Sequence, residues 1–68
     1  MTHEELINYK KTLNGKIKDI SRTIEYFKSI GVTSLINTLE DTRDFLIQSV
    51  YIINTELYKE EENKWHSQ

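Results

Sequence analysis

The 68-residue sequence contains no cysteine and no proline, and it has only two glycines and two histidines. Without cysteine, the chain can form neither a disulfide bond nor a thiolate metal site. His3 and His66 stand at opposite ends of the sequence, so we expect no metal site, no cofactor and no catalytic residue. A chain this short has a high ratio of surface to volume, and its core must therefore come from close helix packing or from self-association.

Long apolar runs are also lacking. No segment approaches the ~20 apolar residues that cross a bilayer, and no apolar stretch follows a basic N-terminus. We therefore expect neither a membrane span nor a signal peptide, and we place the protein in the cytoplasm of a bacterium or of a phage host. The frequent isoleucine, lysine, asparagine and tyrosine residues are typical of an AT-rich genome, such as that of a low-GC bacterium or its phages.

The first half of the chain predicts one long helix over about residues 3–30. Thr2-His3-Glu4-Glu5 fits the capping box, in which a threonine oxygen accepts the third N–H of a helix. Asn14-Gly15 is a weak point within this helix, since glycine costs about 1 kcal/mol there relative to alanine. Apolar residues recur at steps of three and four along one stripe, with Lys10 at its one polar position: Leu6, Leu13, Ile17, Ile20, Ile24 and Phe27.

The second half predicts another helix, over about residues 34–61, followed by a frayed tail at 62–68. Its apolar stripe has Arg43 at the one polar position and otherwise consists of Ile36, Leu39, Leu46, Val50, Ile53 and Leu57. The two stripes differ in phase, which favours a bend at 31–33 over one continuous helix. Gly31 can adopt the left-handed conformation that ends a helix, and Val32 can fold back on Phe27 as in a Schellman motif. Thr33 or Ser34 can cap the next helix.

These features predict an all-α fold, an antiparallel helical hairpin that forms a single domain over residues 1–68. If the numbers of facing residues sum to about 63, apolar residues meet in five of seven layers. Arg43 and Lys10 occupy the other two layers as structural residues that fix the register, Arg43 reaching toward Asp19 and Lys10 toward Glu56. Their alternative role is to bind an anionic small molecule.

The segment "SIGVTSLI" at residues 29–36 resembles the turn of a DNA-reading helix-turn-helix. That motif needs a small residue four positions before the glycine, where this chain has Phe27. The helix after the turn carries Glu40, Asp41 and Asp44 against a single arginine, so it would repel phosphate. We therefore interpret this segment as the bend of a hairpin.

The second helix has more apolar surface than one partner helix can cover. Phe45 and Ile52 lie on one flank of its stripe, and Ile47, Tyr51 and Tyr58 lie on the other. Trp65 extends the tyrosine row at the same spacing of seven. We expect these six residues to form an interface, either between two hairpins that dimerise into a four-helix bundle or with another protein.

The second helix is also acidic. Residues 32–68 carry seven acidic residues against three basic ones, whereas residues 1–31 carry four against six. Asp41, Asp44, Glu56 and Glu60 form a candidate acidic docking face for a basic protein surface, or an imitation of a nucleic-acid backbone.

We expect a non-enzymatic regulator or inhibitor that forms a homodimer and docks a helical face on one other protein. Its size and composition suit a protein encoded by a phage or mobile element. The first alternative is a structural subunit that only assembles with itself. The second is a nucleic-acid-associated or nucleic-acid-mimicking protein, although the net charge of −2 provides no basic surface for nucleic acid.

Overall fold

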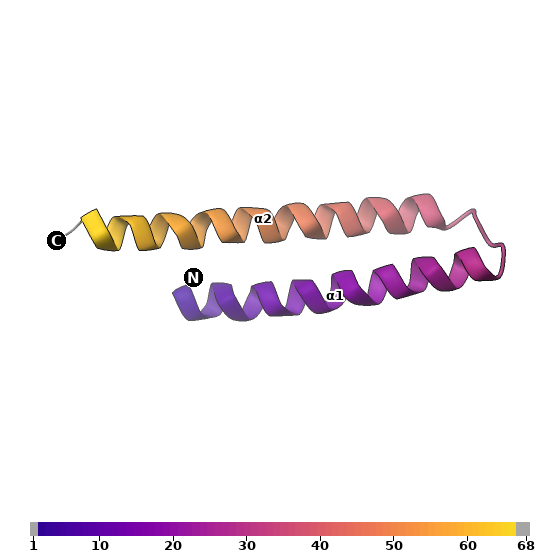
Figure 1. Ribbon diagram of the computed structural model, residues 1–68, viewed down its shortest axis with the longest axis horizontal. Coiled ribbons are helices and arrows are strands. Elements are labelled where there is room, and N and C mark those ends of the chain that lie inside the picture. Colours follow the sequence, from indigo (N-terminus) through magenta and orange to yellow (C-terminus); the bar gives the residue numbers. More distant parts are fainter. Residues whose placement is uncertain (1, 67–68) are drawn as a thin grey trace.

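A computed structural model gives the backbone of residues 2–66 and the side chains of residues 2–59. Helix α1 (His3–Ser29) and helix α2 (Ile36–His66) run antiparallel and pack side by side as a helical hairpin (Figure 1). This confirms the all-α class and the hairpin topology. The hairpin is a rod of 57 × 16 × 15 Å, and α2 continues past the N-terminal end of α1.

Helix α1 begins at the capping motif expected from the sequence. Thr2 is the N-cap residue, and its Oγ1 accepts a hydrogen bond from the Glu5 backbone N–H at 3.1 Å. The Thr2 hydroxyl also lies 3.2 Å from Glu5 Oε1, to which it donates. Glu4 and Glu5 place negative charge in the first turn, where the helix dipole favours it.

Helix α1 ends in a Schellman motif centred on Gly31. Gly31 has a φ of 76°, and its N–H donates to the Lys28 carbonyl at 3.2 Å. The Val32 N–H donates to the Phe27 carbonyl at 3.0 Å, which completes the pair of hydrogen bonds that defines the motif. The expected role of Gly31 is therefore confirmed, and the Val32 side chain, expected to fold back on Phe27, is half-buried beside this reversal.

Helix α2 differs from the expectation at both ends. It begins at Ile36, and the Leu39 N–H donates to the carbonyl of Leu35, which therefore occupies the N-cap position. Within residues 2–59, neither Thr33 nor Ser34 caps the helix with its side chain, so that prediction was wrong; Thr33 contributes its backbone carbonyl to the Ile36 N–H instead. At the other end the backbone stays helical to His66, beyond the expected limit near residue 61.

The core is a single apolar seam between the two helices. Leu13, Ile24, Ile36 and Ile53 are buried, Ile24 to 1% exposure. Every other residue of the two predicted stripes is half-buried: Leu6, Lys10, Ile17, Ile20, Phe27, Leu39, Arg43, Leu46, Val50 and Leu57. The phase of both stripes is therefore confirmed, because a shift of one residue would turn them out of the seam by about 100°.

The polar positions of the seam do not form the expected ion pairs. Lys10 and Arg43 are half-buried, but in the part of the chain with described side chains neither pairs with a carboxylate. Glu56 pairs with Lys59 of its own helix at 3.6 Å, so it is not the partner of Lys10. The predicted pairs were wrong, because at a solvated edge of the seam an ion pair gains little and must order two long side chains.

Candidate interaction surface

The outer side of α2 carries four large apolar side chains, which we call the outer strip: Phe45, Tyr51, Ile52 and Tyr58. Their exposed fractions lie between 60% and 73%. Successive residues of an α-helix are rotated by about 100° around its axis. Around the axis of α2, Tyr51 therefore lies about 140° from the seam residue Leu46 in one direction, and Ile52 lies about 120° from it in the other. The hairpin therefore leaves the strip uncovered.

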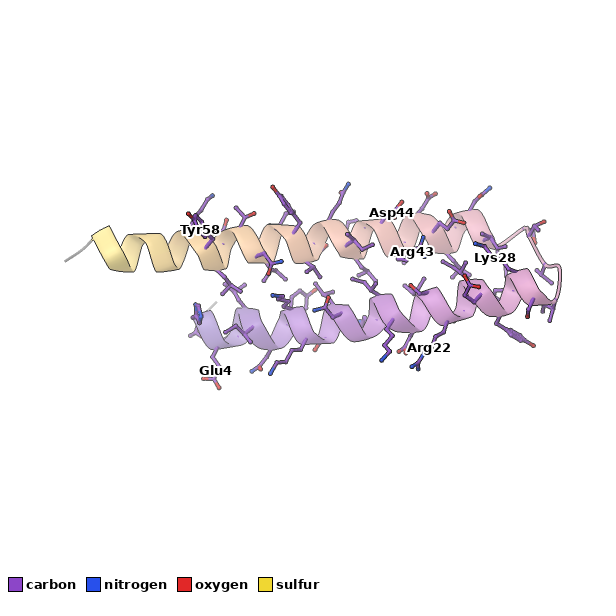
Figure 2. All side chains as sticks on the ribbon, viewed as in Figure 1. Glu4, Arg22, Lys28, Arg43, Asp44 and Tyr58 are labelled. Atoms are coloured by element: carbon purple, nitrogen blue, oxygen red, sulfur yellow. The ribbon has the colours of Figure 1, made fainter. Side chains whose placement is uncertain are left out.

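The side chains in Figure 2 agree with this geometry. Asp44 and Tyr58 lie on the side of α2 that faces away from α1, whereas Arg43 lies between the helices. Glu4 and Arg22 lie on the corresponding outer side of α1. The two outer faces differ in character, because large exposed apolar side chains gather on the outer face of α2.

The outer strip consists of two rows. Phe45 and Ile52 form one row, and Tyr51 and Tyr58 form the other, since residues seven apart lie almost above each other on a helix. Gln48 and Thr55 run between the rows. The Thr55 hydroxyl donates to the Tyr51 carbonyl at 3.0 Å, so its hydrogen-bonding need is met within the helix and its methyl group can enter an apolar interface.

The remaining predicted interface residues have different surroundings. Ile47 is 47% exposed and lies about 100° from Leu46, between the seam and the tyrosine row. The Trp65 side chain lies outside the described residues, although its backbone belongs to α2. Ile30 and Leu35, on either side of the turn, are also exposed apolar residues. The periodic pattern did not predict a surface there, because both residues lie outside the two stripes.

The predicted acidic residues do not form one cluster. Asp41 and Asp44 are exposed and lie about 60° apart at the N-terminal end of the outer strip. Glu56 lies about 18 Å farther along the helix from Asp44 and about 120° around it, where it pairs with Lys59. The Glu60 side chain lies outside the described residues. The described part therefore offers one acidic pair and, at the opposite end of the strip, one lysine.

The molecule exposes more surface than a compact monomer of its size. Its accessible surface is 5462 Å² for a mass of 8.1 kDa, against about 4,500 Å² expected for a folded monomer. Its radius of gyration is 16.2 Å, against about 11 Å for a compact domain of this length. The excess surface follows from the architecture, because two helices cover only one side of each other.

Nothing in the described part of the chain resembles a metal centre or a membrane span. No three His, Cys, Asp or Glu side chains are grouped so that they could hold a metal ion. None of the described helical segments is long and apolar enough to cross a bilayer. No protein family matches the chain, and comparison with curated proteins and with solved structures gives no match.

Proposed function

We propose that this chain is a protein-interaction module that docks the outer strip of α2 on a helical surface of another polypeptide. The observation that carries the proposal is the high exposure of all four strip residues on one continuous helix. Exposed apolar patches of this kind mark interaction sites, and aromatic side chains are enriched at the energetic centres of interfaces. An amphipathic helix laid against apolar side chains is a common mode of such recognition.

The energetics support an interface on this strip. Removing a large apolar side chain from water contributes roughly 1.5–3 kcal/mol when burial is complete. The strip has four such side chains, which can offset part of the entropic cost of association. Asp41 and Asp44 beside the strip disfavour nucleic acid as the partner, because they repel phosphate.

The first form of this function is a small regulator or inhibitor that docks on one target protein. Such a chain needs no catalytic group, since occupying a surface is sufficient to block or stabilise its target. The acidic pair Asp41 and Asp44 then steers the approach to a basic region of that target.

The second form is a subunit that assembles with its own copies, with two hairpins joined as a dimer of four helices. The excess of about 1,000 Å² over a compact monomer favours this form. It is close to the roughly 800 Å² that each partner covers in a standard interface.

The test is affinity capture with two matched variants. Tyr51→Lys places a charge in the strip, and Tyr26→Lys places the same charge on α1, where Tyr26 is also exposed. Polypeptides recovered with the unmodified chain should be retained by Tyr26→Lys and lost by Tyr51→Lys, and mass spectrometry identifies them. Equal recovery by both variants would contradict docking through the strip.

A further inference from the structure

We infer that the polypeptide covering the outer strip is a second copy of this chain, with its α2 antiparallel to the first. The two α2 helices cross at a twofold axis that passes between Tyr51 and Ile52. This inference rests on the proposed function, because it names the partner of the same surface.

The strip is self-complementary when it is reversed end for end. When the second α2 runs antiparallel to the first and the twofold axis passes between Tyr51 and Ile52, Phe45 of one copy lies at the same height along the helix axis as Tyr58 of the other. Tyr51 and Ile52 come level with each other at the centre. Each large apolar residue of the strip thus lies level with a large apolar residue of the second copy, as a twofold-symmetric interface allows.

The charges at the two ends of the strip follow the same symmetry. Asp44 immediately precedes the strip and Lys59 immediately follows it. The reversal brings Asp44 of one copy level with Lys59 of the other, at both ends of the interface. Lys59 is 62% exposed, and its present contact with Glu56 is an exposed pair at 3.6 Å, a kind of contact that holds a lysine only weakly.

A parallel arrangement lacks this complementarity. It would bring Asp44 level with Asp44 of the second copy and Lys59 level with Lys59, so like charges would face each other at both ends. Antiparallel packing also aligns the dipoles of the two helices favourably. The charges therefore select the antiparallel orientation.

The position of the strip also determines the shape of the dimer. The strip faces away from α1, as Figure 2 shows for Tyr58, so the second hairpin packs on the far side of α2. The four helices then lie in a row, with the two α2 helices in the middle and an α1 helix at each edge. This differs from a compact bundle, in which α2 would use the edge beside its seam, where Ile47 lies.

The first experiment is sedimentation equilibrium of the unmodified chain and the matched tyrosine variants. The unmodified chain and Tyr26→Lys should be dimers, and Tyr51→Lys should raise the dimer dissociation constant by about 30-fold or more. Circular dichroism should show the same helical content for all three, because both tyrosines are exposed. Dimerisation of Tyr51→Lys as tight as that of the unmodified chain would overturn the inference.

The second experiment swaps the charges at the ends of the strip. Asp44→Lys and Lys59→Asp should each weaken the dimer by about 3- to 10-fold, and the double variant should recover the original affinity. The effect should shrink at high salt concentration. A double variant that dimerises no better than the single variants would rule out the antiparallel pairing.

Cross-linking between introduced cysteines reports the orientation of the two α2 helices directly. The chain has no cysteine of its own that could interfere. A mixture of Asp44→Cys and Lys59→Cys chains should be joined by a short bismaleimide, because the two positions lie level across the interface. Asp44→Cys chains alone should remain unlinked, since their thiols are then about 22 Å apart along the axis. Links within Asp44→Cys alone would show a parallel dimer and overturn the inference.

The outcomes separate this inference from the proposed function. A chain that sediments as a monomer at all concentrations overturns the inference. If such a monomer still loses a captured protein on Tyr51→Lys, the docking function of the strip stands and its partner is a different protein. If neither self-association nor capture depends on Tyr51, both proposals fail.

Discussion

The two glycines of this chain have opposite structural roles. Gly31 has a φ of 76° and closes the Schellman motif after α1. Gly15 lies inside α1 in ordinary helical conformation, and a Cβ atom added there would meet nothing within 4 Å. The lack of a Cβ atom is therefore required at the turn and unfavourable in the helix.

Replacing each glycine by alanine should shift stability in opposite directions. Gly31→Ala should lower the free energy of unfolding by about 1 kcal/mol or more, because an L-residue resists the left-handed region. Gly15→Ala should raise it by roughly 0.5–1 kcal/mol, because alanine favours the helix. Urea denaturation, monitored by circular dichroism at one protein concentration, measures the change in the free energy of unfolding for both variants. A shift of the same sign in both variants would contradict these roles.

At the scale of the elements, one apolar seam joins α1 and α2. Within residues 2–59, with His3 set aside, no side-chain hydrogen bond or ion pair crosses between the helices. The helical threonine and serine hydroxyls that form hydrogen bonds, such as those of Thr23 and Ser49, donate to carbonyls of their own helix. The pairing therefore depends on apolar packing.

Truncating the most buried seam residue should be costly. Ile24→Ala should lower the free energy of unfolding by about 2–5 kcal/mol, because Ile24 is 1% exposed. The substitution leaves a cavity between the two helices, and no further layer of side chains lies behind the seam to fill it. Ile30→Ala, the same change at a 53% exposed residue, should cost less than about 1 kcal/mol. Chemical denaturation of both variants tests this difference. Similar losses in the free energy of unfolding would contradict a core that lies in the seam between α1 and α2.

Arg43 offers a test of the polar positions in the seam. It is half-buried and forms no ion pair among the described residues, so Arg43→Met should leave the free energy of unfolding unchanged or raise it by about 1 kcal/mol. Arg22→Met, on the outer side of α1, serves as the control and should stay within about 0.5 kcal/mol. Thermal and urea denaturation measure both. A loss above about 2 kcal/mol in Arg43→Met would show that the guanidinium group has a structural or ligand-binding role.

The whole molecule is a thin rod whose accessible surface exceeds that of a compact monomer. Four residues of the described part, Leu13, Ile24, Ile36 and Ile53, are buried, which is a small core for a chain of this length. Small folds without disulfides or metals commonly gain stability by association. The exposed strip on α2 is where such association adds the most apolar burial.

If association contributes to stability, the melting temperature should depend on protein concentration. A tenfold increase in concentration should raise the Tm of the unmodified chain by about 3–6 °C, because dissociation accompanies unfolding. Tyr51→Lys should melt lower, with a Tm that does not change with concentration. Calorimetry or circular dichroism over a hundredfold range gives the comparison. A constant Tm for the unmodified chain would show that the hairpin folds as an independent monomer.

Local sequence signals were sufficient for most of the hairpin. The steps of three and four placed every stripe residue in the seam, the Thr2 cap started α1, and Gly31 ended it. These features depend on residues within one or two helical turns, so the sequence contains them directly. The start of α2 and the ion pairs of Lys10 and Arg43 were predicted wrongly, because each depends on how the turn and the second helix are placed in space.

The amino-acid pattern alone predicts the two helices, the turn between them and the stripe along which they meet. It also showed that α2 has more apolar residues than its stripe requires. Which of these residues stay uncovered follows from the packing of the two helices, since burial depends on where the partner helix lies. With α1 on one side of α2, Phe45, Tyr51, Ile52 and Tyr58 remain on the other side in contact with water.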